Sequence, residues 1–182
     1  MRIITGSARG VRLVTLEGDS TRPTSERAKE AVFSILQFGI EGREVLDLFA
    51  GSGQLGLEAL SRGAKHACLA DKSADAIKVI RTNAEKTRLA SSCTIIHADH
   101  AETLARLRGS KFDIVFLDPP YHSGFIAESL GLLVKYSLLK PTSVVVCESS
   151  EPTVPGADFE VVKRAKYGIA HITLLRPAIA EQ

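Results

Sequence analysis

The chain has 182 residues, a mass of 19.6 kDa and a formal net charge of +2, with 45% hydrophobic and 24% charged residues. This length suits one domain and this composition is typical of globular proteins, which argues against a second full-sized domain and against extensive disorder. The charge is unevenly divided, because residues 1–43 and 158–182 carry net charges of +2 and +1 around a middle part of −1.

The N-terminal part predicts a hairpin followed by a helix. Strand-like runs at residues 2–5 and 11–16 surround Gly6 and Gly10, which is typical of a β-hairpin. Apolar residues at helical spacing then predict an amphipathic helix from Ala28 to Leu36, capped by Thr24 or Ser25. We therefore expect residues 1–20 to form a hairpin extension and residues 21–182 to form the main domain.

From residue 44 the pattern alternates between strand and helix. The predicted strands are 44–49, 66–70, 93–97, 113–117 and 143–148, with predicted helices at 54–62, 73–87, 100–108 and 124–137. Two final runs, 158–166 and 169–175, predict an antiparallel hairpin. The fold class is therefore α/β, a three-layer sandwich with a Rossmann-like, mostly parallel sheet. In such sheets ligands bind beyond the carboxyl ends of the strands.

Several classes of protein are disfavoured by what the sequence lacks. Cys68, Cys93 and Cys147 form no CxxC pair, which argues against a zinc knuckle and for buried free thiols. The apolar runs reach about six residues, far below the roughly 20 that span a bilayer, and no signal peptide is evident. We expect a soluble, cytoplasmic monomer with no metal and no membrane partner.

A glycine loop follows the first strand of the alternating part. Gly51, Gly53 and Gly56 satisfy the GxGxxG pattern, which allows a tight turn and a close approach of ligand to backbone. Asp71 and Asp99 end the next two strands, where carboxylates can accept hydrogen bonds from a ribose and from an adenine amino group. The alternative for each acid is a solvated helix cap. Together they indicate an adenosine-containing ligand, with NAD and S-adenosylmethionine as candidates.

Asp47 favours the second candidate. It lies four residues before Gly51, where a carboxylate would repel a pyrophosphate and attract the cationic methionine end of S-adenosylmethionine.

The segment Asp118-Pro119-Pro120-Tyr121 follows the fourth strand and indicates chemistry on an amino group. The two prolines hold the backbone rigidly, so that the Asp118 carboxylate and the Pro119 carbonyl can accept both hydrogens of an exocyclic amine. These bonds would aim the nitrogen lone pair at an electrophile, while Tyr121 stacks on the extruded base. A structural Pro-Pro turn is the alternative.

Residues 44–148, which carry the glycine loop, the strand-end acids and the DPPY segment, resemble class I S-adenosylmethionine-dependent methyltransferases that act on amino groups. With residues 1–6 and the Arg22-Pro23-Thr24 segment that leads into Arg27, Glu30 and Phe33, the chain resembles the RsmD family. That family methylates N2 of the guanine at position 966 of bacterial 16S rRNA. The resemblance implies the same reaction here, on 16S rRNA within the 30S subunit.

The resemblance also implies roles for individual residues. Asp118, Pro119, Pro120 and Tyr121 are expected to orient the guanine. The expected cofactor-binding residues are Asp47, Phe49, Ala50, Gly51, Gly53, Gly56, Asp71, Lys72, Asp99, His100 and Asp118. The expected RNA-binding residues are Arg2, Arg9, Arg12, Arg22, His122, Lys163, Arg164 and Lys166. For the basic residues at the two ends, which would contact phosphates, a solvated surface is the alternative.

Three other functions remain open from the residues. A DNA adenine-N6 methyltransferase can use the same DPPY chemistry, although the chain has no room for the recognition domain that such enzymes usually carry. A nicotinamide-dependent oxidoreductase can use the same glycine loop. An RNA-binding module with a decayed fold would keep the sheet without the complete set of strand-end residues.

Overall fold

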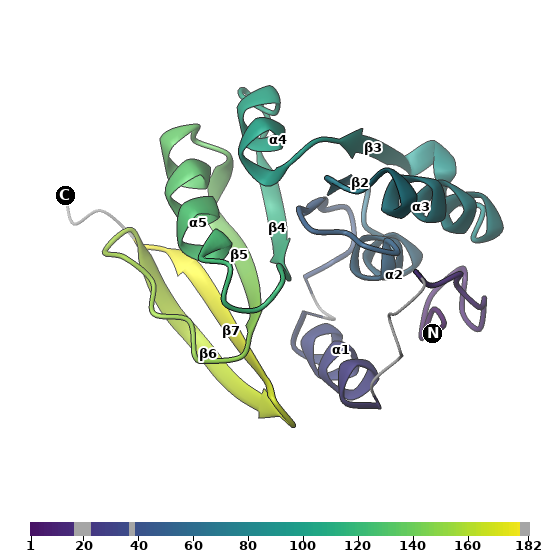
Figure 1. Cartoon of the computed structure of the whole chain (residues 1–182), viewed down its shortest axis with the longest axis horizontal. Coiled ribbons are helices and arrows are strands. Elements are labelled where there is room, and N and C mark those ends of the chain that lie inside the picture. The colour runs from purple at the N-terminus through teal and green to yellow at the C-terminus, as the bar shows by residue number, and fades with distance from the viewer. Residues whose placement is uncertain (17–22, 37–38, 179–182) are drawn as a thin grey trace.

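The computed structural model describes residues 1–16, 23–36 and 39–178, which form an α/β sandwich around one seven-stranded sheet (Figure 1). The strand order is β3-β2-β1-β4-β5-β7-β6. The helices are α1 (Pro23–Leu36), α2 (Gln54–Ser61), α3 (Ala74–Lys86), α4 (His100–Arg106) and α5 (Phe125–Lys135), with a short 3-10 turn at Ala90–Ser92. The strands are β1 (Glu44–Asp47), β2 (His66–Asp71), β3 (Cys93–His97), β4 (Phe112–Leu117), β5 (Leu139–Ser149), β6 (Phe159–Tyr167) and β7 (Ala170–Pro177).

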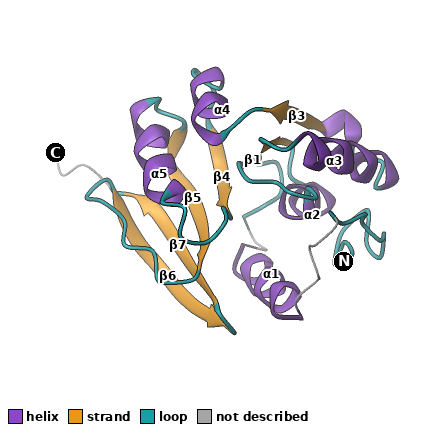
Figure 2. Cartoon of the chain, in the orientation of Figure 1, coloured by secondary structure: helices purple, strands orange, loops and turns teal. Residues whose placement is uncertain are grey.

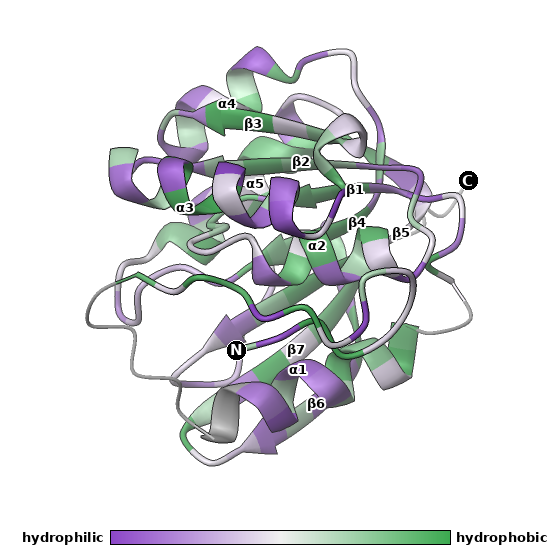
Figure 3. Ribbon diagram, turned by 90° about the vertical axis from the view of Figure 1, so that its right-hand side faces the viewer, coloured by the Kyte–Doolittle hydropathy of each residue, from purple (hydrophilic) through white to green (hydrophobic). Residues whose placement is uncertain are grey.

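Helices cover both faces of the sheet (Figure 2), and the buried apolar residues form two cores. Residues from α1, α2 and α3 build one core, and residues from α4 and α5 build the other. All six residues of β4 are buried, which explains the apolar run from Ile114 to Leu117, and the hydrophobic colour follows the central strands in Figure 3. The predicted three-layer sandwich with a mostly parallel sheet is confirmed.

The order in which the chain adds strands to the sheet reverses between β1 and β4, which sets the place of a ligand site. The chain moves outward from β1 through β2 to β3 and then returns to β4 on the other side of β1. β1 runs parallel to both β2 and β4, and Asp47 of β1 lies in register with Phe116 of β4. The carboxyl ends of β1 and β4 therefore meet at a topological switch point, where open α/β sheets bind ligands.

The C-terminal hairpin is as predicted, and the N-terminal one is less regular. β6 and β7 pair antiparallel around Gly168, which has a φ of +62°. Near the N-terminus the only bridge among the described residues joins Arg2 to Arg12. Backbone hydrogen bonds such as Ile3 N–H to Val11 C=O, at 3.0 Å, complete a turn rather than two strands.

This difference has a physical reason, because α2 and α3 satisfy part of the N-terminal backbone. Ser7 N–H donates to the carbonyl of Ser61 in α2, and Val14 N–H donates to the side chain of Asn83 in α3. Backbone groups that bond to α2 and α3 in this way are not available for a strand ladder. The predicted boundary at residue 20 lies outside the described residues.

The cysteines are free thiols in the described structure. Cys68 and Cys147 are buried and Cys93 is half-buried, and burial raises their pKa values to about 11, 12 and 11, respectively. The described residues contain no cluster of three His, Cys, Asp or Glu side chains that could hold a metal ion. Within the same residues, every helix is too short or too polar to cross a membrane.

Candidate active site

Asp47 lies at the carboxyl end of β1, directly before the glycine loop, and its side chain is almost completely buried. One carboxylate oxygen, Oδ2, accepts a hydrogen bond from Gly56 N–H at 3.0 Å. The other oxygen, Oδ1, is buried and has no hydrogen-bond partner among the described residues. Burial raises the pKa of Asp47 to about 7; the Gly56 N–H opposes this shift, and the charge of Asp71 adds to it.

An unpartnered buried carboxylate oxygen is costly, because desolvation is not compensated by a hydrogen bond or a charge. A cationic group placed against Asp47 would provide that compensation. The structure therefore fits the expected position of the methionine end of S-adenosylmethionine.

The glycines of the loop are required by its geometry. Gly51 and Gly53 have φ values of +56° and +80°, in the left-handed region that favours glycine, and Gly53 caps the start of α2. Gly56 lies inside α2 against β2, where an added Cβ would meet Leu69 Cδ2 at 2.0 Å. Two glycines thus shape the turn, and the third lets the helix pack against the sheet.

Asp71, at the end of β2, fixes two loops. Its Oδ2 accepts from Gly51 N–H at 2.9 Å, and its Oδ1 accepts from Ser73 N–H at 2.8 Å. The carboxylate thus connects the glycine loop to the start of α3. Lys72 is exposed beside it. A role for Asp71 in binding a ribose stays a prediction.

Asp99 is the N-cap of α4, where its Oδ1 accepts from Glu102 N–H at 2.8 Å. The helix-cap alternative is therefore realised for this residue, and its predicted contact with adenine is not tested.

An aromatic group lies beside this cap. The His100 ring is 5.6 Å from Phe49 and 4.5 Å from Phe125, centroid to centroid, and the two phenylalanines stack at 6.1 Å. His100 Nε2 also lies 3.0 Å from Glu128 Oε2. Phe49 and His100 were expected at the cofactor, and Phe125 was missed. Aromatic rings such as these can pack against an adenine ring.

The DPPY segment leaves β4 at the switch point, next to β5. Asp118 is exposed, Pro119 is buried, and Tyr121 is half-buried. Burial raises the pKa of Glu148 in β5, and hydrogen bonding by the Tyr121 side chain opposes this shift, so Tyr121 lies beside the neighbouring strand. His122, which has a φ of +61°, is exposed, and its Nε2 lies 3.5 Å from Ser150 Oγ.

A cavity of about 70 Å³ lies between α1, the start of α2 and the ends of β4, β5 and β7. Its polar lining consists of Lys29, Gln54, Asp118 and Glu148. The apolar lining consists of Val32, Leu55, Phe116, Leu117, Val146 and Ile172. The cavity thus places the predicted catalytic carboxylate beside the first turn of the glycine-loop helix.

Sequence reasoning missed three of these four polar lining residues. Glu148 follows the buried run of β5 just as Asp118 follows β4, so the same strand-end pattern could have identified it. Gln54 follows the last loop glycine before α2, but its identity carried no signal. Lys29 is a charged residue of α1 with only 4% of its surface exposed, and the helical spacing of apolar residues gave no sign of this burial.

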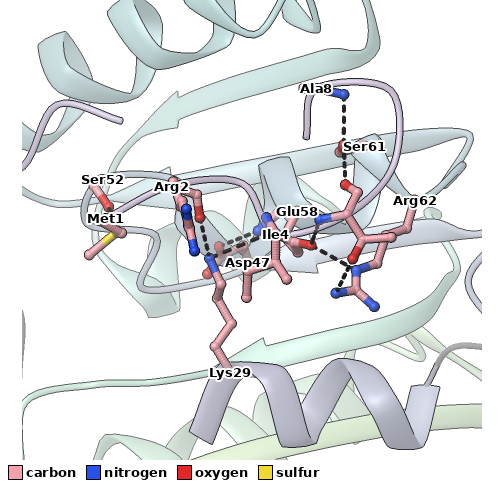
Figure 4. A network of polar contacts seen from close by, with 12 residues as sticks. Met1, Arg2, Ile4, Ala8, Lys29, Asp47, Ser52, Glu58, Ser61 and Arg62 are labelled. Carbon is pink, nitrogen blue, oxygen red and sulfur yellow. Dashed lines mark hydrogen bonds and ion pairs between the residues drawn. The ribbon is translucent and has the colours of Figure 1, made fainter. Parts of the chain in front are cut away.

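Glu58 holds this side of the site together (Figure 4). This α2 residue has no exposed surface, and its carboxylate accepts from Ile4 N–H at 2.8 Å and Thr5 N–H at 3.1 Å. It also pairs with Arg62 at 2.8 Å and with Lys29 at 3.6 Å. Burial lowers the pKa of Lys29, while Glu58 opposes this shift. The network joins α1, α2 and the N-terminal segment.

The predicted RNA-binding residues lie on two separate parts of the surface. Arg2, Arg9 and Arg12 are exposed on the N-terminal segment, while Lys163, Arg164 and Lys166 are exposed on β6. Arg164 donates to the Thr153 carbonyl at 3.2 Å, and Arg22 lies outside the described residues. α1 packs against β6, and its Lys29 donates to the Arg2 carbonyl at 3.1 Å, so α1 lies between the two basic segments (Figure 1).

Acidic residues accompany part of the N-terminal basic segment. Glu26 and Glu30 of α1 line the same hollow of about 200 Å³ as Arg2 and Arg9. Their carboxylates weaken the positive potential there, which leaves the solvated-surface alternative open for these two arginines.

Comparisons with known proteins agree with this architecture. The family model described as "Conserved hypothetical protein 95" matches residues 1–176. Ribosomal RNA small subunit methyltransferase D of Haemophilus influenzae is 33% identical over 96% of this chain and 92% of its own length. The protein of the same name from Escherichia coli is 35% identical over 85% of this chain and 79% of its own length. The solved structure of Escherichia coli yhhF is 30% identical, covers 97% of both chains and has a TM-score of 0.87.

Proposed function

Because the chain belongs to the family described as Conserved hypothetical protein 95, the RsmD family, we propose that it methylates the exocyclic N2 amino group of a guanine in 16S rRNA. The observation that carries the proposal is the position of the DPPY segment. It leaves β4 at the sheet's switch point and lines a cavity shared with α1 and the first turn of α2. The names of the relatives support an rRNA substrate.

The proposed methyl donor is S-adenosylmethionine, which when bound supplies a methyl group on a positively charged sulfur. Asp47 and the glycine loop would hold its methionine end, and the unpartnered Asp47 Oδ1 fits a cationic amino group. Asp71 would hold the ribose. Asp99 and the ring cluster of Phe49 and His100 would hold the adenine.

The chain's own residues would prepare the amino group for attack. The nitrogen lone pair of guanine N2 is delocalised into the ring, so the free base is a poor nucleophile. The Asp118 carboxylate and the Pro119 carbonyl accept one hydrogen bond each from the two N–H groups, which favours a pyramidal nitrogen and aims its lone pair. The nitrogen gains a methyl group and loses one proton, for which Asp118 is the nearest acceptor.

We expect the substrate to be the assembled 30S subunit, with the base at position 966 as its target. A chain of this size has little surface for reading RNA sequence, so an assembled particle would present the base. The two basic segments on either side of α1 would then contact phosphates near the cavity.

The test is methyl transfer from tritiated S-adenosylmethionine to 30S subunits from a strain that lacks the enzyme, with the modified base mapped. Protein-free 16S rRNA and DNA serve as parallel substrates. Label on one guanine of 30S subunits is the expected result, and label on DNA alone would refute the proposal. Equal rates on protein-free rRNA would refute the 30S preference. Calorimetry with NAD and with S-adenosylmethionine tests the oxidoreductase alternative, which predicts tight binding of NAD and no binding of S-adenosylmethionine.

A further inference from the structure

The cavity beside the DPPY segment contains two carboxylates from adjacent strands. β4 and β5 run parallel with Leu117 in register with Cys147, so Asp118 and Glu148 are the next residues of neighbouring strands. Neighbouring strands lie about 4.8 Å apart, and both side chains line the same cavity. Asp118 has a proposed task at the amino group, whereas Glu148 has none in that mechanism.

Glu148 is held in place by Tyr121. Burial raises the pKa of Glu148, and the hydrogen bond from the Tyr121 hydroxyl opposes that shift, since it stabilises the charged carboxylate. A carboxylate has about four acceptor positions on its two oxygens, so one hydrogen bond from Tyr121 leaves Glu148 with capacity to accept from a ligand. This also gives the Tyr121 hydroxyl a task, in addition to the stacking expected of its ring.

The polar groups that line the cavity indicate which hydrogen-bond donors and acceptors a ligand needs in order to bind there. The Asp118 and Glu148 carboxylates can accept hydrogen bonds from a ligand, and the buried Gln54 Nε2, which has no partner among the described residues, requires an acceptor. A volume of about 70 Å³ exceeds the roughly 15 Å³ that one water needs, so the cavity has room for more than a single water. The occupant therefore presents two adjacent donors and at least one acceptor.

Among the four RNA bases, only guanine has a ring N–H next to its exocyclic amino group. Its N1–H and N2 amine supply adjacent donors, and its N3 and O6 supply acceptors. Adenine and cytosine instead place an acceptor nitrogen beside the amine, where a second carboxylate would repel it. The pair of carboxylates thus selects guanine, whereas Asp118 alone would accept any exocyclic amine.

We propose that Glu148 determines base specificity by accepting a hydrogen bond from N1–H of the target guanine, beside Asp118 at N2. This inference rests on the proposed guanine-N2 activity. Reading the hydrogen-bonding edge of an extruded base is the usual way in which enzymes that act on bases choose their substrate. Glu148, at the end of β5, then selects the base, and Asp118, after β4, positions its amino group.

The test compares guanine with 2-aminopurine at the target nucleotide of 16S rRNA assembled into 30S subunits. 2-Aminopurine keeps the amino group but has an acceptor at N1. In Glu148→Gln the side-chain oxygen still accepts from Tyr121, so the new NH2 group faces the base. We expect transfer to guanine to fall roughly 10- to 100-fold, the factor of one charge-assisted hydrogen bond, while transfer to 2-aminopurine rises or stays constant.

Two variants serve as controls. Glu151→Gln removes an exposed carboxylate three residues away and is expected to behave as wild type. Tyr121→Phe removes the hydroxyl, so transfer falls but the preference for guanine over 2-aminopurine persists. An unchanged preference in Glu148→Gln, with wild-type enzyme active on guanine, would overturn the role of Glu148 alone. Wild-type enzyme that leaves guanine unmodified and methylates another base would overturn the proposed function instead.

Discussion

Replacing Asp47 with asparagine tests whether the buried carboxylate before the glycine loop destabilises the fold. Burial raises its pKa to about 7, whereas the unfolded chain ionises near the ordinary value of about 4. Between these values the folded state binds more protons than the unfolded state. Stability from this group therefore rises as the pH falls from about 8 toward 4.

The size of this effect follows from the two pKa values. At roughly 1.4 kcal/mol per pKa unit, the wild type gains about 2 kcal/mol in free energy of unfolding between about pH 8 and about pH 5.5 through Asp47. Asparagine does not titrate, so Asp47→Asn lacks this gain. For a domain of this size, the difference in melting temperature between wild type and variant should change by about 4–8 °C over that range.

The assay is thermal unfolding followed by circular dichroism, without cofactor, at several pH values between about 5.5 and 8. Asp113→Asn is the matched control, because hydrogen bonds from Lys140, the Glu44 amide and Arg43 outweigh burial and keep the pKa of Asp113 below its ordinary value. Its difference from wild type should therefore be constant across this range. A constant difference for Asp47→Asn as well would refute the reasoning.

Three further predictions follow from the site and its supports. Asp118→Ala should lower methyl transfer by at least about 100-fold, while calorimetry finds S-adenosylmethionine affinity within about threefold of wild type; a parallel loss of both would contradict its role at the amino group. Gly6→Ala, whose Cβ would lie 1.7 Å from a carbonyl oxygen of α2, should lower the free energy of unfolding in urea by more than about 2 kcal/mol. The matched Gly10→Ala, with a similar positive φ but open space around the Cβ, should cost about 1 kcal/mol, and equal losses would refute the contact. Charge reversal at Arg9 and Arg12 should reduce the salt dependence of 30S binding by about one to two units of log–log slope, and an unchanged slope would assign both arginines to a solvated surface.

Much of the fold could be predicted because its signals are local. The buried run of β4 indicated a central strand, since an apolar sequence of that length has to be covered on both faces. The glycines at 51 and 53 were informative because a left-handed φ excludes most other residues. The N-terminal hairpin was less well predicted, because its backbone bonds partly to α2 and α3, and sequence periodicity does not report such long-range partners.

Part of the candidate site could likewise be predicted from local sequence, and part of it could not. The sequence by itself determined the strand-end positions of Asp47, Asp71 and Asp118, since the alternation of strands and helices places these residues at one edge of the sheet. Only the tertiary structure decided that α1 closes a cavity over that edge, that Lys29 is buried, and that Glu148 lies beside Asp118. The physical reason is that burial and pairing depend on which elements pack together. α1 packs against β6 and β7, which come from a distant part of the chain, and this packing brings Lys29 and Val32 to the cavity.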